Sequence, residues 1–176
     1  MITVLCGATW IASAQQMTSE TSLNSTNDMG MDHSHIPIAL PESANRMALS
    51  LSLREDSMSG YNLILDTKHY HWSIPPSGMD MMAMMSASID EATNNVEGHA
   101  HLYVNGEKIQ RVYGKYLHLP EALFRDGLNS ISVTLNNHGH MYWTIDDKKV
   151  LATLFINRGG SPLITHKFES FPANLD

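Results

Sequence analysis

Residues 97–107, EGHAHLYVNGE, constrain the fold more than any other part of the sequence. Read as a β-strand, they place three aliphatic side chains on one face and three polar or aromatic side chains on the other. The aliphatic face consists of Ala100, Leu102 and Val104, and the opposite face of His99, His101 and Tyr103. Asn105 and Gly106 then provide the two positive φ angles that a tight type I′ turn requires. The stretch therefore predicts a β-hairpin with one buried aliphatic face and two histidines side by side on the other.

Pairs of histidines separated by one residue occur repeatedly, and on a strand such a pair can bind one metal ion. The pairs are His33/His35, His69/His71, His99/His101 and His138/His140. The last pair directly follows a predicted strand, so it meets the pair at residues 99–101 if the two strands are neighbours. His118, on a strand between them in the sequence, would then complete a site of three or four nitrogen ligands. In the alternative interpretation, these side chains only form hydrogen bonds around loops.

The composition also indicates metal binding, because the 176 residues include 10 histidines and 12 methionines. Both side chains are metal ligands. A formal net charge of −7 and a pI near 5.7 argue against nucleic acid as a partner, since proteins that bind it present basic surfaces. No phosphate-binding loop, GxSxG motif or cysteine–histidine pair is found, so the common hydrolase chemistries have no candidate residues.

Residues 1–14 are largely apolar and end in Ala-Ser-Ala, which is typical of a signal peptide and its cleavage site. About 12 apolar residues are too few to span a bilayer, so we expect no membrane span in the mature chain. The expected location is the periplasm or the extracellular medium. Cys6, the only cysteine, would be removed with the leader. Disulfides and thiolate copper centres are then excluded from the mature chain.

Residues 15–45 are rich in serine, threonine, asparagine and methionine, which predicts a flexible tail. Four possible metal ligands occupy every second position of one segment: Met29, Met31, His33 and His35. In an extended chain they lie on one side and form a loose chelator, although a polar linker without a role is the alternative. The segment is similar to the Met/His-rich extracellular tails of eukaryotic copper transporters.

Residues 46–176 are predicted to form one β-rich domain, because alternating apolar residues are bounded by turn signals throughout. The predicted strands are residues 46–53, 61–73, 97–104, 107–113, 116–120, 129–136, 141–145 and 149–157. The strand at 61–73 changes from leucine to histidine on one face, which indicates a bulge or a departure from the core. The expected fold is an antiparallel β-sandwich of about seven strands, Ig-like or cupredoxin-like, with an eight-stranded barrel or jelly roll as the alternative. His166, in the less readable C-terminal run, is expected at the surface.

The insert at residues 74–96 contains a methionine cluster, and residues 80–93 are compatible with one or two helical turns. The cluster consists of Met79, Met81, Met82, Met84 and Met85. Methionine clusters serve either as packing material or as ligands, and thioethers favour Cu(I) over zinc and hard ions. Because the cluster lies between two histidine pairs in the sequence, both interpretations stay open.

The combination of imidazoles and thioethers favours copper, as Cu(I) or Cu(II), with zinc as the less favoured metal. A different class of function, a cupin-like metal-dependent oxidoreductase, is the alternative. Its supporting feature is the His99/His101 pair followed by Glu107. The glutamate stands beyond the hairpin turn, and no second cupin motif follows.

Several segments together resemble a family of small exported bacterial domains, mostly uncharacterised β-sandwiches, some of them associated with copper handling. They are GHAHLYVNGEK at 98–108, RVYG at 111–114, HLP at 118–120 and VTLN at 133–136. The resemblance covers about residues 60–157 and implies that His99, His101, His118 and His140 hold the motif's histidine positions. At residues 69–72 the sequence keeps only the aromatic places of the family's Asn-Phe-x-Phe pattern, and the methionine insert replaces a shorter loop.

These patterns together predict an exported copper-binding protein that captures, buffers or delivers copper, with no enzymatic activity required. Another copper protein is a candidate donor or acceptor.

Overall fold

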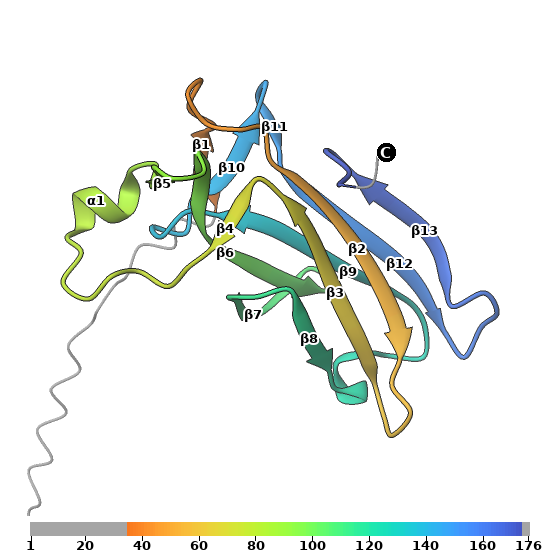
Figure 1. Cartoon of the computed structure of the whole chain (residues 1–176). Coiled ribbons are helices and arrows are strands. Elements are labelled where there is room, and N and C mark those ends of the chain that lie inside the picture. The colour runs from red at the N-terminus through yellow and green to blue at the C-terminus, as the bar shows by residue number, and fades with distance from the viewer. Residues whose placement is uncertain (1–34, 174–176) are drawn as a thin grey trace, which may run out of the picture. The chain divides into compact units, whose positions relative to one another are not determined.

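The computed structural model describes residues 35–173, which form two β-sheets packed around one apolar core (Figure 1). The smaller sheet has the order β2 (Ala48–Glu55), β3 (Tyr61–Lys68) and β8 (Tyr116–Leu119). The larger sheet contains β1 (Pro37–Ala39), β4 (Tyr70–Trp72), β5 (Ile89–Asp90), β6 (Asn95–Val104), β7 (Glu107–Val112), β9 (Gly127–Asn136), β10 (Tyr142–Ile145), β11 (Lys148–Lys149), β12 (Leu151–Arg158) and β13 (Ile164–Glu169). The predicted all-β sandwich is confirmed.

Alternating side chains build the core from both sheets. Leucines 49, 51, 63 and 65 of the smaller sheet face the aliphatic residues of β6, β9 and β12, and all of these leucines are at most 2% exposed. Full burial of each such side chain contributes about 1.5–3 kcal/mol. The face of β6 that carries Ala100, Leu102 and Val104 is the buried one, so its histidine face points away from this core.

The hairpin turns form as predicted. Asn105 and Gly106 have φ angles of 53° and 84°, and Asp146 and Asp147 have 49° and 60°. Positive φ at both central residues is the geometry of a type I′ turn, which matches the twist of the flanking strands.

The predicted long strand at residues 61–73 is instead two strands in different sheets. β3 ends at Lys68, His69 adopts a φ of 55°, and β4 then pairs parallel with β6. The expected departure from the core is therefore a crossover between the sheets. It brings residues 70–72 beside the strand that carries His99.

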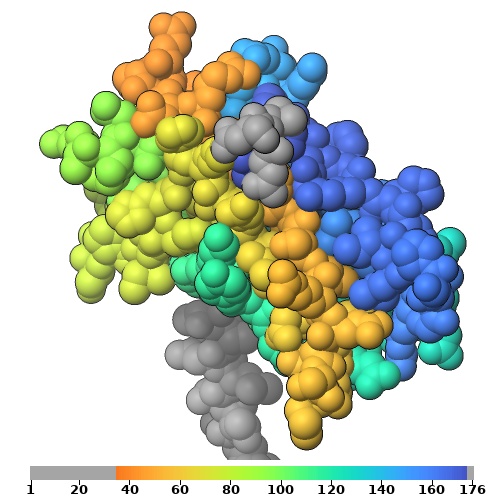
Figure 2. Space-filling view, turned by 45° about the vertical axis from the view of Figure 1, so that its right-hand side comes forward, coloured from red at the N-terminus to blue at the C-terminus, as the bar shows by residue number. Residues whose placement is uncertain are grey.

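Two further strands lie in segments without a clear strand pattern in the sequence. β1, within the residues assigned to the tail, pairs parallel with β10, and β13 pairs antiparallel with β12. The segment after β13 lies against β2, where Leu49 N donates to Phe171 O at 2.8 Å and Ala173 N donates to Ser50 Oγ at 2.8 Å. In the space-filling view, the blue C-terminal part accordingly borders the orange β2 (Figure 2).

Helical structure is limited to short segments in the described part of the chain. The insert forms α1 (Met81–Met85), which the Asp80 side chain caps by accepting from Ala83 N at 2.8 Å, and η2 (Glu121–Leu123) is a 3₁₀ turn. Among residues 35–173, no helix combines the length and the apolar character that crossing a membrane requires.

Candidate metal centre

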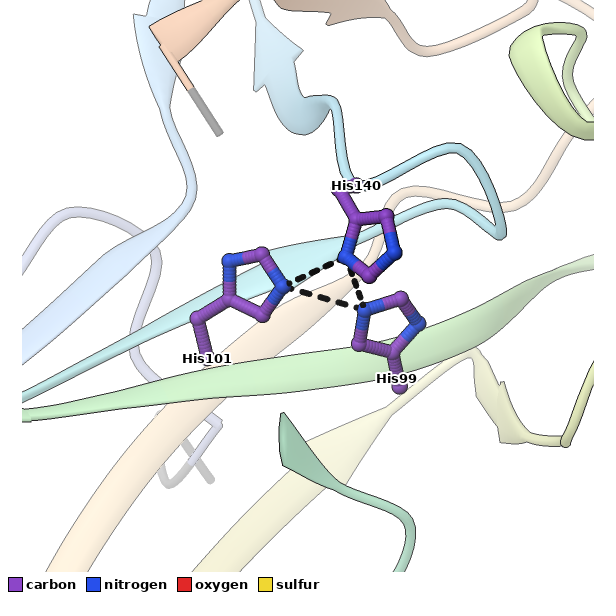
Figure 3. Close-up of side chains that lie close together, drawn as sticks. All are labelled: His99, His101 and His140. Atoms are coloured by element: carbon purple, nitrogen blue, oxygen red, sulfur yellow. Dashed lines mark hydrogen bonds between the residues drawn. The ribbon is translucent and has the colours of Figure 1, made fainter. Parts of the chain in front are cut away.

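Three imidazoles converge on one point from two separate segments (Figure 3). His99 Nε2 lies 3.1 Å from His101 Nε2 and 3.2 Å from His140 Nδ1, and the last two atoms are 3.1 Å apart. Three ligands of a tetrahedral ion with metal–nitrogen bonds of about 2.0–2.1 Å are roughly 3.3 Å apart. The triangle thus has nearly the size that a metal ion requires, and it leaves a fourth coordination position for another ligand.

Strand pairing between β6 and β9 brings the two segments together. His99 and His101 stand opposite Asn136 and Thr134 of β9, and the loop that carries His140 begins where β9 ends. This neighbourhood is the arrangement that the sequence required for the two histidine pairs to meet. One pair supplies both of its members, whereas the pair at 138–140 supplies only His140.

A chain of hydrogen bonds holds the loop in place. Thr134 Oγ1 donates to Asn136 Oδ1 at 2.8 Å, and Asn136 Nδ2 donates to the carbonyl oxygen of His140 at 2.7 Å. The loop also closes on itself, because Asn137 Oδ1 accepts from Met141 N at 2.9 Å. These contacts fix a backbone in which His140 has a φ of 69°. Positions with such φ values in non-glycine residues are uncommon and often functional.

Gly98 allows the strands to approach closely beside the centre. A Cβ atom at this position would lie 2.0 Å from Asn136 O and 2.8 Å from the Tyr70 hydroxyl. That hydroxyl is within hydrogen-bonding distance of the carbonyl oxygens of His99, at 2.7 Å, and of Asn136, at 2.8 Å. The glycine and the tyrosine together set the position of the His99 backbone.

The centre favours uncharged imidazoles. His99 and His101 are both 0% exposed. Burial lowers the pKa of His99 to about 2, with further contributions from His101, His140 and the Arg111 guanidinium. Because metals bind the neutral ring, a histidine that stays unprotonated keeps its lone pair available. His99 Nδ1 has no hydrogen-bond partner among residues 35–173.

The cluster is shielded from solvent by neighbouring side chains but is partly accessible. The Tyr113 ring lies 5.3 Å from the His99 ring between centroids and is 39% exposed, and His140 is also partly exposed. Arg111, Tyr113 and Asn136 fall within the segments that carry the family resemblance, but the sequence predicts no role for them. Their roles depend on strand pairing, which the sequence does not show.

The structure does not bring His118 to the centre. Its strand β8 pairs with β3 in the smaller sheet, where His118 stands opposite Asn62 and is exposed. The expectation that this strand completes the ligand set is corrected, because Leu119 packs into the core from the other sheet. Which sheet a short strand joins is decided by packing and not by its own alternation.

The remaining predicted histidines of the domain lie near the centre or at the surface. His138 is 2% exposed, His69 occupies the break between β3 and β4, and His71 is exposed beside two carboxylates. His166 is exposed, as predicted. His35, the first described residue, is exposed, whereas Met29, Met31, His33 and the predicted signal peptide lie outside the described residues.

The methionine insert reaches the loop that carries His140. Asn137 Nδ2 donates to the carbonyl oxygens of Met84, at 3.1 Å, and of Ser86, at 3.2 Å. A Cβ atom built at Gly139 would lie 2.9 Å from Met85 Sδ, so this thioether packs against the loop. Met81 and Met82 point into solvent, with 67% and 79% of their surface exposed, and Met79 is partly buried.

Comparison of the chain with protein-family models, curated proteins and solved structures finds no match. The class of site is therefore defined by its own geometry, as a buried three-histidine cluster able to hold a metal ion on the outer face of a β-sandwich sheet.

Proposed function

We propose that this chain is an exported copper-binding protein that captures, buffers or delivers copper through His99, His101 and His140. The observation that carries the proposal is the triangle of three ring nitrogens 3.1–3.2 Å apart, two of them on fully buried histidines. The site contains no carboxylate or thiolate ligand among the described residues. Neutral nitrogen ligands suit copper, zinc, nickel and iron.

Two features favour copper, and Cu(I) in particular, over zinc. Arg111, which is exposed, stands opposite His101 in the β6–β7 pairing and contributes to the lowered pKa of His99, so its charge, screened in part by solvent, also disfavours a bound cation. Coulomb repulsion scales with the charge of the ion, so a monovalent ion is disfavoured less than a divalent one. The thioether of Met85 packs against Gly139, beside His140, and thioethers favour Cu(I).

The cupin-like alternative has lost its supporting feature. Glu107 is exposed at the start of β7, across the turn from the histidines, and does not belong to the cluster. Export and the resemblance to exported domains with copper-handling members rest on the sequence patterns at residues 1–14 and 98–136. They supply the location and the context of the proposal.

Metal competition tests the proposal directly. The metal-free protein is dialysed against equal total concentrations of copper and zinc, and separately against Cu(I) with a chelator that buffers its free concentration. We expect retention of one copper ion per chain at the histidine cluster. Retention of zinc at equal copper, or failure to compete for Cu(I), would contradict the copper assignment.

A further inference from the structure

A carboxylate, a side chain able to bind metal, follows the three-histidine cluster on the same face of β6. Glu97 precedes His99 by two residues and therefore shares its face. Its carboxylate lies at the edge of a small surface group, since His71 Nδ1 is 3.4 Å from Glu97 Oε1 and 3.6 Å from Asp90 Oδ2. The His71 side chain is 52% exposed and both carboxylates are 23% exposed. This group of one imidazole and two carboxylates presents negative charge to solvent beside the buried centre.

His138 lies in the loop that follows β9, two residues before His140, and no hydrogen bond explains its burial. It is 2% exposed, and neither of its ring nitrogens has a hydrogen-bond partner within residues 35–173. Buried polar side chains are nearly always satisfied, so two unsatisfied nitrogens on one ring indicate a group that receives a ligand.

Strand pairing places His138 on the side of β6 where Glu97 lies. Asn136, the last residue of β9, stands opposite His99, so the antiparallel chain continues past β9 in the direction of Glu97. Burial lowers the pKa of His138, and the Glu97 carboxylate opposes part of that shift. His138 in turn contributes to the lowered pKa of His99. Both electrostatic effects agree with the placement that the strand pairing gives.

We propose that Glu97 and His138 form a second, transient position for the metal ion, through which the ion passes between solvent and the three-histidine cluster. This inference rests on the proposed function, because it assigns a loading route to that same centre. The ligand class is a copper ion, which the carboxylates at residues 90 and 97 attract and the buried imidazole accepts. Ser88 Oγ, which donates to Glu97 Oε2 at 2.8 Å, holds the carboxylate in place.

A transient position has a kinetic signature that differs from that of a final ligand. Its loss slows loading and release by the same factor and leaves the dissociation constant unchanged, because neither end state contains it. Loss of a final ligand speeds release and weakens binding. Charged residues that line a site raise association rates by about 10- to 1,000-fold through electrostatic attraction. We therefore expect loss of this position to slow loading and release by about tenfold or more.

The experiment measures copper transfer into and out of the metal-free full chain by stopped flow, with a coloured Cu(I)–chelator complex as donor and the free chelator as acceptor. The variants are Glu97→Gln and His138→Asn. The matched controls are Glu107→Gln, which removes the same charge at the far end of the hairpin, and His166→Asn, which removes an exposed histidine. Circular dichroism verifies folding, and the partly exposed Glu97 provides a test even if His138→Asn fails to fold.

We expect both variants to slow loading and release about equally at an unchanged dissociation constant, and both controls to behave as wild type. Added salt should slow loading of wild type more than of Glu97→Gln, because it screens the carboxylate. Wild-type rates in both variants would overturn the inference and leave the proposed function intact. Faster release together with weaker binding would do the same, because it would identify the residues as final ligands. A wild-type protein that retains no copper overturns both.

Discussion

His99 and His101 combine two properties that rarely occur together, since they lie on the outer face of a sheet and yet are fully buried. The rings nearest to them are those of His140, Tyr103 and Tyr113. The sandwich core and the candidate metal centre are therefore built on opposite faces of one strand. This separation means that changes at the centre affect metal binding more than folding.

Replacing both residues by alanine (His99→Ala with His101→Ala) tests this separation. We expect the double variant to fold and to lose its tight site, with affinity reduced by more than about a hundredfold, because loss of outer-shell partners alone costs about 10–100-fold. Copper titration and thermal unfolding measure the two effects. Unchanged stoichiometry and affinity would exclude these two residues as ligands.

The lowered pKa of His99 predicts a dependence of stability on pH. Its ordinary value is near 6.5 and its folded value is about 2, so as the pH falls below about 6.5 the unfolded chain binds a proton that the folded chain does not. The free energy of unfolding of the metal-free protein should therefore decrease on acidification, by about 1.4 kcal/mol per pH unit from this residue. Urea unfolding between pH 7 and pH 4 measures the slope. His99→Asn should make the slope shallower, and an identical slope in that variant would contradict the assignment.

Among the structural elements, β6 has the central position. It pairs with β4, β5, β7 and β9, so it links the crossover strand, the insert and the hairpin to the strand that precedes His140. The tight approach at Gly98 is the local condition for this pairing. A side chain there collides with backbone atoms, which cannot rotate away as a flexible side chain can.

Gly98→Ala should destabilise the fold by about 1–3 kcal/mol, the usual cost of overpacking. The added Cβ would lie 2.0 Å from Asn136 O, and Asn136 also holds the carbonyl oxygen of His140. Copper affinity should fall along with stability. Gly114→Ala is the control, because its Cβ would meet nothing within 4 Å. Denaturant unfolding should separate the two variants, and equal stabilities would refute the close-approach argument.

At the scale of the whole molecule, we expect the predicted tail and the sandwich to have different tasks in metal binding. An extended chain that must be ordered around an ion loses about 1–2 kcal/mol of backbone entropy per residue, whereas the strands hold the cluster before binding. A preformed centre therefore binds more tightly and exchanges more slowly than a flexible chelator.

Deleting residues 15–34 should accordingly reduce the number of copper ions bound and slow loading at low copper. The affinity of the remaining site should not change. This deletion spares β1, whose pairing with β10 belongs to the domain. Equilibrium titration and loading kinetics of the truncated protein are the measurements. Loss of the tightest site would show that the tail supplies a ligand to the domain.

Alternation and turn chemistry, both local properties, made much of the architecture predictable. The hairpin predicted at 97–113, the strand predicted at 129–136 and the type I′ turns follow from side-chain periodicity of two and from residues that accept positive φ. The observed strands differ from these bounds by one or two residues at their ends. The pairing of β6 with β9, which brings His99 and His101 to His140, was an explicit condition of the predicted site. Strands β1 and β13 escaped prediction because their short segments lack a clear alternation.

The sequence by itself determined which residue types are available for metal chemistry and which face of each strand they occupy. Only the tertiary structure decided which of them meet. His118 has the same alternating context as His99, yet its strand joins the other sheet, and His138 stands two residues from His140 without joining the triangle. The physical reason is that alternation is encoded by neighbours in the chain, whereas the choice of sheet and the path of a loop depend on packing and hydrogen bonds between residues far apart in sequence.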